Sequence, residues 1–201
     1  MKVKICGVTC VADALHAARA GADAIGLNFA ARSPRRVSVE QAAAIAAALP
    51  AGVCRVGIFV DAGRDEMAAV VARVGLDALQ FHGDEPPALC AGWGAKTIKA
   101  VRVRDAAALA AASAYAVDFI LADAYVDGQA GGTGRRVPLE WLGGVARERL
   151  ILAGGLTPET VAEAVRAVRP AVVDVASGVE AAPGIKDPEK VERFIAHARL
   201  A

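Results

Sequence analysis

Large aromatic side chains are scarce in this sequence of 201 residues, which contains only five Phe, two Tyr and two Trp. Hydrophobic residues nevertheless make up 55% of the chain, and the mean hydropathy is +0.39. Alanine supplies much of the apolar content, which therefore consists largely of small side chains. Intrinsic disorder is excluded, because it requires low hydrophobicity together with a high net charge. A chain of this length is typical of one domain, which buries about 70% of the surface that it exposes when unfolded.

Long uncharged segments are also absent. The longest is Gln41–Cys54, with 14 residues interrupted by Pro50 and Gly52, whereas about 20 apolar residues are needed to span a membrane. Lys and Arg number 23 and Asp and Glu number 22, so the formal net charge is only +1. The charge balance gives no basic surface for nucleic acid or for an anionic membrane. We expect neither a nucleic acid nor a membrane as a partner.

Cysteine occurs only four times, at positions 6, 10, 54 and 90. This usage in a chain of ordinary size favours reduced thiols over disulfides. Cys6 and Cys10 have neither a second cysteine pair nor a nearby His, which argues against a zinc site. The first residues pass directly into an apolar strand pattern without the hydrophobic region of a signal peptide. We therefore predict a cytoplasmic protein without a bound metal.

Short β-rich runs alternate with alanine-rich helical segments along the chain. Two of these segments begin with clear helix-start signals, because Ser38 opens a capping box and Pro188 follows Asp187 at a first helical position. Pro158 is expected at a first helical position as well. The predicted strands are Val3–Cys6, Ala24–Asn28, Arg55–Val60, Ala78–His82, Thr97–Arg102, Asp118–Asp123, Leu150–Ala153 and Val172–Ala176.

This alternation predicts a parallel sheet built from βαβ units. The eight strands and about eight helices, in strict alternation, fit a closed (β/α)8 barrel. We predict a single-domain α/β fold of this kind over residues 1–201. A doubly wound open sheet is the alternative, but eight units are more than such sheets usually contain.

Polar residues stand at the carboxyl ends of several predicted strands, where the catalytic groups of such barrels lie. Cys6 ends the first strand, and it is either a buried small residue or a thiolate base, which requires some lowering of the usual thiol pKa of about 8.5. Asp123 ends the sixth strand, and it either caps a turn or acts as a general acid. His82 ends the fourth strand. One of the three arginines at 32–36, turned inward, could clamp a carboxylate.

Glycine-rich loops follow the last three predicted strands. Gly131–Gly134 follow the sixth strand, Gly154 and Gly155 the seventh, and Ser177 and Gly178 the eighth. The loops after strands seven and eight of these barrels often bind phosphate, with help from the N-terminus of a following helix. Glycines that only turn the chain are the alternative. Two such loops in these positions favour a small phosphorylated substrate.

An ordered set of sequence blocks resembles the phosphoribosylanthranilate isomerase family. The blocks are Lys4–Gly7, Gly21–Gly26 with Ser33–Arg35, Val56–Val60, Gln80–Gly83, Gly131–Gly134, Leu152–Leu156 and Val173–Glu180. They extend in family order to Lys186 and Asp187, so the resemblance covers essentially the whole chain. It implies a (β/α)8 barrel of tryptophan biosynthesis. Such a barrel converts N-(5′-phosphoribosyl)anthranilate into 1-(2-carboxyphenylamino)-1-deoxyribulose 5-phosphate by an Amadori rearrangement.

The resemblance also implies roles for individual residues. Cys6 matches the general base, Asp123 the general acid and Arg35 the arginine that holds the anthranilate carboxylate. The remaining substrate-binding residues that it implies are His82, Gly154, Gly155, Asp174, Ser177 and Gly178. It implies no metal and no organic cofactor, and it leaves both a monomer and a homodimer open.

Three other functions remain as alternatives. A sister isomerase of histidine biosynthesis performs the same rearrangement with two aspartates, and Cys6 at the first strand argues against it. A non-catalytic phosphate-binding barrel would keep the glycine loops but has no need of an acid and a thiol at opposed strand ends. A Schiff-base aldolase would need a lysine inside the barrel, and Lys99 is the one in a suitable position.

Overall fold

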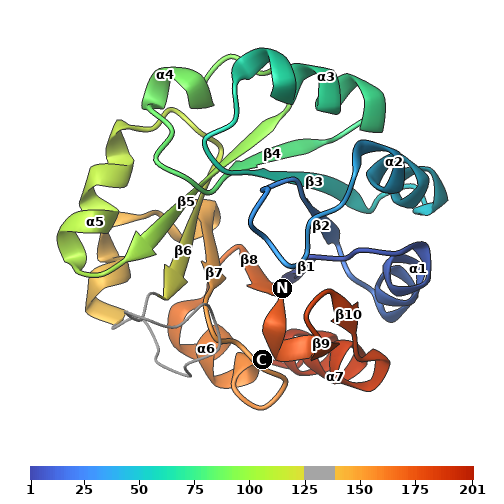
Figure 1. Ribbon diagram of the computed structural model, residues 1–201. Helices are drawn as coiled ribbons and strands as arrows, with labels where there is room; N and C mark the ends of the chain where they lie inside the picture. Colours follow the sequence, from blue (N-terminus) through green and yellow to red (C-terminus); the bar gives the residue numbers. More distant parts are fainter. Residues whose placement is uncertain (125–138) are drawn as a thin grey trace.

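The computed structural model describes residues 1–124 and 139–201 and contains a closed barrel of eight parallel strands in the order β1 to β8 (Figure 1). The predicted (β/α)8 barrel is confirmed, and every predicted strand overlaps an observed one. The barrel strands are β1 (Lys2–Cys6), β2 (Ala24–Asn28), β3 (Cys54–Phe59), β4 (Ala78–Phe81), β5 (Lys96–Val103), β6 (Phe119–Ala124), β7 (Leu150–Ala153) and β8 (Val172–Val175). Parallel pairing of β1 with β8 closes the sheet, with Lys4 opposite Asp174.

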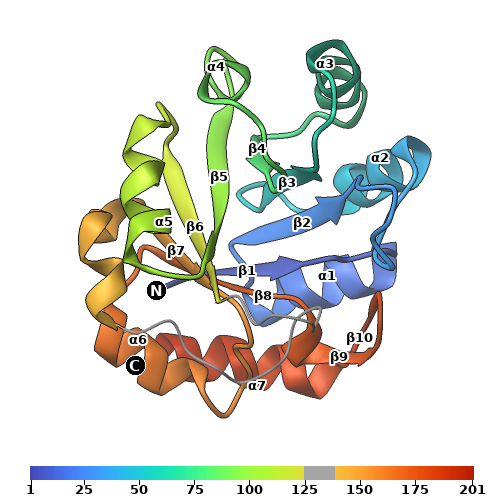
Figure 2. The same cartoon turned by 60° about the vertical axis from the view of Figure 1, so that its left-hand side comes forward.

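Helices cover the outside of the barrel, and α7 packs against both α6 and α1 and so completes the ring (Figures 1 and 2). None in the described part of the chain is long and apolar enough to cross a membrane. The α-helices are α1 (Val11–Ala20), α2 (Val39–Ala48), α3 (Arg64–Val74), α4 (Pro87–Cys90), α5 (Ala106–Ala110), α6 (Val161–Val168) and α7 (Pro188–Arg199). A short 3₁₀ helix, Ala111–Ala114, continues α5.

The described residues depart from the expected strict alternation with about eight helices at two places. Between β6 and β7 the described residues form two 3₁₀ helices, Leu139–Gly144 and Arg147–Arg149, instead of an α-helix. A Gly-Gly pair ends the first of them, and glycine is a poor helix former. After β8 a 3₁₀ turn, Ser177–Val179, and an antiparallel hairpin of β9 (Glu180–Ala182) and β10 (Ile185–Lys186) precede α7.

Two of the three predicted helix starts are confirmed. Ser38 and Gln41 form a reciprocal capping box at α2, and the Asp187 side chain accepts a hydrogen bond from the backbone N–H of Lys190 at the start of α7. The third prediction is wrong, because α6 begins at Val161 and not at Pro158. Thr160 Oγ1 accepts from the backbone N–H of Thr157 at 3.0 Å. This local bond holds the preceding residues in a turn.

Apolar side chains fill two layers, one between the strands and the helices and one inside the barrel. Successive residues of a strand face opposite sides of the sheet. On β1, Val3 and Ile5 belong to the outer layer, so Lys4 and Cys6 face the barrel interior. The inner layer consists of Val56, Ala78, Ile98, Ala100, Leu121, Ile151 and Ala153. Ala14 and Ala17 on the inner face of α1 are completely buried, and their small side chains allow the helix to pack closely on the barrel.

Candidate active site

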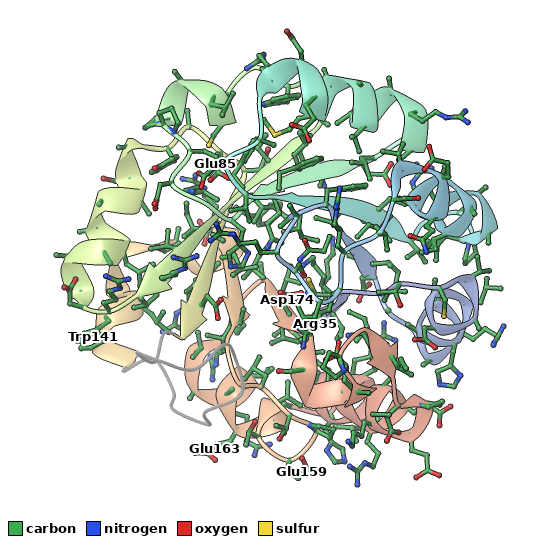
Figure 3. The ribbon with its side chains drawn as sticks, viewed as in Figure 1. Arg35, Glu85, Trp141, Glu159, Glu163 and Asp174 are labelled. Atoms are coloured by element: carbon green, nitrogen blue, oxygen red, sulfur yellow. The ribbon has the colours of Figure 1, made fainter. Side chains whose placement is uncertain are left out.

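The predicted site residues meet at the carboxyl ends of the barrel strands. By the same alternation, Asp123 on β6 and Asp174 on β8 face inward, because their neighbours Ala122 and Val173 lie in the outer layer. Cys6 is the last residue of β1, and His82 directly follows β4. Figure 3 shows Asp174 and Arg35 near the middle of the ring of strands, whereas Glu159 and Glu163 lie at the outer edge.

Cys6 lies beside a buried ion pair. Lys4 Nζ is 2.8 Å from Asp174 Oδ1, and the Lys4 ammonium also interacts electrostatically with the Cys6 thiol. Burial raises the pKa of Cys6, and the positive charges of Lys4 and Lys186 offset only part of this rise. The net pKa of Lys4 is raised, because the negative charges beside it outweigh its burial. Asp174, predicted to bind substrate, is thus also the partner of Lys4.

Two glycines make room for these side chains. A Cβ at Gly26 on β2 would lie 2.9 Å from Cys6 Sγ, so a larger residue would displace the thiol. A Cβ at Gly7, where φ is +70°, would overlap the Cδ of Arg35. Arg35 therefore crosses directly over the backbone at Gly7, next to the end of β1. Arg35 is thus the arginine of this loop that lies next to the end of β1, and its role as a carboxylate clamp stays a prediction.

Arg35 forms a two-pronged ion pair with Glu180. Its Nε donates to Glu180 Oε1 at 2.7 Å, and its Nη2 donates to Oε2 at 2.6 Å. Glu180 also accepts from Lys186 Nζ at 2.9 Å and from the backbone N–H of Gly184 at 3.2 Å. Burial raises the pKa of Glu180, but the bonds from Arg35 and Lys186 outweigh it and hold that pKa below its usual value. The carboxylate of Glu180 thus connects the β2 loop to the β9–β10 hairpin.

His82 lies between Gln80 and Asp123. His82 Nε2 is 3.5 Å from Asp123 Oδ2, and His82 Nδ1 is 2.9 Å from Gln80 Nε2. With the Gln80 amide oriented as in this structure, its N–H donates to Nδ1, so the proton of the neutral imidazole is on Nε2 and faces Asp123. Gln80 is 1% exposed, and its Oε1 has no hydrogen-bond partner among the described residues.

The loop after β4 is held by a second buried ion pair. Lys99 Nζ on β5 is 2.6 Å from Glu85 Oε2 and donates to the carbonyl oxygen of Gly83 at 2.6 Å. Glu85 also accepts from the backbone N–H groups of Gly83 and Asp61. Lys99 is therefore an ion-paired residue that fixes the loop beside His82. It lies between Ile98 and Ala100 of the inner layer and so faces away from the barrel interior, which argues against the imine-forming role of the aldolase alternative.

The glycine loops after β7 and β8 touch each other. Gly154 and Gly155 have φ of +88° and +65°, a region that favours glycine. A Cβ at Gly178 would lie 1.9 Å from the carbonyl oxygen of Leu156, so only glycine fits there. A helix, α6, does follow the first loop, but Ser177 and Gly178 of the second loop are part of the three-residue 3₁₀ turn Ser177–Val179, and the β9–β10 hairpin follows before α7. The third predicted loop, Gly131–Gly134, lies outside the described residues.

Four buried side chains of the site were not assigned a role by the sequence: Lys4, Gln80, Glu180 and Lys186. A signal for Lys4 is present, because strand alternation puts it on the same face of β1 as Cys6. Glu180 and Lys186 have no comparable signal, because the hairpin that buries them was not predicted. Over residues 1–124 and 139–201, no group of three or more His, Cys, Asp or Glu side chains could hold a metal ion.

The chain is similar to phosphoribosylanthranilate isomerases over nearly its whole length. The family model described as N-(5′-phosphoribosyl)anthranilate (PRA) isomerase matches residues 3–197. N-(5′-phosphoribosyl)anthranilate isomerase of Pseudomonas fluorescens (strain Pf0-1) is 51% identical over 197 residues, which cover 97% of both chains. The crystal structure of phosphoribosyl anthranilate isomerase from Thermotoga maritima superposes with a TM-score of 0.91 at 38% identity, with both chains fully covered.

Two further solved structures are similar over the whole of both chains. One, at a TM-score of 0.86 and 37% identity, is a phosphoribosyl anthranilate isomerase in complex with reduced 1-(o-carboxyphenylamino)-1-deoxyribulose 5-phosphate. The other, at 0.87 and 36% identity, shows monomers generated from the dimeric T. maritima enzyme.

Proposed function

The chain belongs to the phosphoribosylanthranilate isomerase family, and we propose that Cys6 and Asp123 are the base and the acid of its reaction. The protein is an isomerase of tryptophan biosynthesis, which converts N-(5′-phosphoribosyl)anthranilate into 1-(2-carboxyphenylamino)-1-deoxyribulose 5-phosphate. The observation that carries the assignment of roles is that a thiol and a carboxyl face the barrel interior at the carboxyl ends of β1 and β6.

Asp123 starts the reaction as the general acid. It transfers a proton to the furanose ring oxygen, the C1′–O bond breaks, and the electron pair of the anthranilate nitrogen forms the C1′=N bond of a protonated Schiff base. The acid must carry its proton at this moment. The neighbouring imidazole of His82, 3.5 Å away, is the polar group that orients the carboxyl.

Cys6 then acts as the base. The protonated imine withdraws electrons from C2′, so the thiolate can remove the C2′ proton while the C–H electron pair becomes the C1′=C2′ bond of an enolamine. In the tautomerisation that follows, C1′ gains a proton and the 2′-hydroxyl loses one, which gives the aminoketone. No net electron or proton is consumed. The ammonium of Lys4 beside the sulfur favours the reactive thiolate.

The two charged ends of the substrate are held apart, which fixes the sugar between acid and base. Glu180 engages two of the five N–H donors of Arg35, and we assign the others to the anthranilate carboxylate. The phosphate is assigned to the backbone N–H groups around Gly154, Gly155, Ser177 and Gly178. His82 and Asp174 complete the set of residues that surround the sugar.

The test measures the loss of fluorescence as the substrate N-(5′-phosphoribosyl)anthranilate rearranges. Cys6→Ala and Asp123→Asn are each expected to lower kcat by about 10² to 10⁴-fold, the usual contribution of a general acid or base. Cys54→Ala and Asp118→Asn are the matched controls, because these residues lie at the amino ends of β3 and β6. Near-full activity in either site variant would remove that residue from its role.

The same assay separates the remaining alternatives. A non-catalytic phosphate-binding barrel would bind inorganic phosphate in calorimetry without turnover of the anthranilate substrate. The histidine-pathway isomerase would turn over its own aminoaldose substrate in preference, although its base is an aspartate and Cys6 occupies that strand end here. We expect turnover of the anthranilate substrate.

We also propose a cytoplasmic location and either a monomeric or a homodimeric state. All four cysteines are free thiols, which supports a cytoplasmic protein. Both a monomer and a homodimer fit, since the similar T. maritima enzyme is called dimeric and its monomers have been solved. Sedimentation equilibrium of the purified chain decides between the two states.

A further inference from the structure

A lysine inside the barrel needs an explanation. Lys4 is 1% exposed and occupies an inward position of a strand whose interior neighbours are mostly apolar. Its ion pair with Asp174 satisfies the charge, with an N–O distance of 2.8 Å. Such a pair is weak evidence of a stabilising role, because the cost of desolvating both ions offsets most of their attraction. Fold stability therefore does not account for this lysine.

The position of Lys4 relative to Cys6 offers a reason. The two residues are two apart on β1, so their side chains share the interior face. The charge of the ammonium lowers the pKa of the thiol relative to burial alone. Asp174 lies directly opposite Lys4 in the β1–β8 register and holds the ammonium from the other side. The ammonium is therefore anchored by a carboxylate on the same interior face of the barrel as the proposed base.

Other charged groups also face Cys6. Lys186 of β10 acts on the thiol with the same sign as Lys4, and Asp174 acts with the opposite sign. Arg35 of the β2 loop is also close enough to interact with the thiol. Glu180 binds both Lys186 and Arg35 and so offsets their charge. Among these cations, Lys4 exerts the largest effect on Cys6 and is the one that lies on the same strand.

We propose that Lys4 is a positioning residue for the base: held by Asp174, its ammonium binds the Cys6 sulfur and stabilises the thiolate that takes the C2′ proton. This depends on the assignment of Cys6 as base. The chemical step is unchanged, with the C2′–H bond broken, an S–H bond formed and the electron pair left in the enolamine. Without the ammonium, burial alone disfavours the thiolate, because a charged sulfur has no compensating partner.

The first experiment measures the thiolate of Cys6 without substrate. The rate of alkylation by iodoacetamide is followed from about pH 6 to about pH 11, and modification of the Cys6 peptide is quantified by mass spectrometry. In Lys4→Met the midpoint is expected to move up by about one pH unit, which is about a tenfold loss of thiolate at neutral pH. Lys4→Arg keeps the cation and should shift the midpoint less.

Lys2→Met is the matched control, since it removes a positive charge from an exposed position on the same strand. It should leave the midpoint unchanged. If Lys4→Met does not fold because Asp174 loses its partner, the double variant Lys4→Met with Asp174→Asn is compared with Asp174→Asn alone, because Asp174 acts on the thiol with the opposite sign and its loss by itself lowers the midpoint. A folded Lys4→Met with the wild-type midpoint, or a double variant with the midpoint of Asp174→Asn, would overturn the proposal.

The second readout is the pH dependence of kcat/KM. In Lys4→Met the rising limb should move to higher pH, so that the loss of activity is largest near neutrality and shrinks in alkali. A loss of equal size at every pH would indicate a merely structural lysine and would also overturn the proposal. If Lys4→Met shifts the alkylation midpoint of Cys6 but Cys6→Ala keeps full activity, the ammonium does act on the thiol but Cys6 is not the base.

Discussion

His82 Nε2 lies 3.5 Å from Asp123 Oδ2, and Gln80 holds the other nitrogen of the same imidazole at 2.9 Å. The two strand ends of β4 and β6 are thereby joined across the mouth of the barrel. The buried ion pair of Lys99 and Glu85 fixes the loop next to His82. The imidazole is consequently held from two sides while it faces the proposed acid.

Replacement of His82 tests this contact. His82→Ala is expected to lower kcat about 10-fold to 100-fold, less than the loss expected for the acid itself, because Asp123 loses an orienting partner and not its proton. Steady-state kinetics measure the effect. A rise in KM with unchanged kcat would show that His82 only binds substrate, and Gln80→Glu offers a second perturbation of the same imidazole.

Arg35→Lys tests the carboxylate clamp. Lysine keeps the charge but loses the planar fork that Glu180 orients. A charge-assisted hydrogen bond contributes about 2 kcal/mol, so KM is expected to rise roughly thirtyfold while kcat changes little. Arg36→Lys, in the same loop and outside this ion pair, is the control and should behave like the wild type. An unchanged KM for Arg35→Lys would remove Arg35 from the binding site.

Gly178→Ala tests the contact between the two phosphate loops. The added Cβ would meet the carbonyl oxygen of Leu156 at 1.9 Å, and backbone must move to relieve the clash. The free energy of unfolding is expected to fall by about 1 to 3 kcal/mol, and inhibition by inorganic phosphate should weaken. Gly63→Ala is the control, because nothing lies within 4 Å of a Cβ built there. Wild-type phosphate inhibition in Gly178→Ala would count against the assigned phosphate site.

The stability of the fold is expected to fall in alkali, in part through Cys90. Burial raises the pKa of this thiol from 9.0 to about 11. Because the folded state keeps the thiol neutral, its contribution to stability is complete below about pH 9 and is lost as the pH rises to about 11. Urea unfolding at several pH values measures this. Cys90→Ala should lose less stability over that interval than the wild type, and parallel curves would contradict the assignment.

The pattern of the sequence was sufficient for the barrel. Eight apolar runs at regular spacing can bury their faces in few ways, and a closed parallel sheet surrounded by helices is one that accommodates all eight. The positions of Cys6, Asp123 and His82 at the mouth follow from the same argument. Strand ends are local features, and their common edge is a consequence of parallel pairing.

The ion pairs within the site could not be predicted from the periodicity of the sequence. Arg35 and Glu180 are 145 residues apart, and Lys4 and Asp174 are 170 apart. Each pair forms only because closing the barrel brings β1 against β8 and the β2 loop against the β9–β10 hairpin. The short α4 and the two 3₁₀ helices described between β6 and β7 could not be predicted either, since prolines and glycines indicate an interruption of a helix but not the structure that replaces it.

The sequence by itself therefore determined the number of barrel strands, the parallel barrel and the placement of Cys6, His82 and Asp123 at one rim, because these depend on periodicity and on residue type. The tertiary structure alone decided which charges neutralise one another, which cation reaches the Cys6 sulfur and which imidazole nitrogen faces Asp123. Those relationships depend on distances of a few ångströms between distant segments. Electrostatic interactions change steeply over such distances in a buried site, so the composition and spacing of the sequence do not predict these contacts.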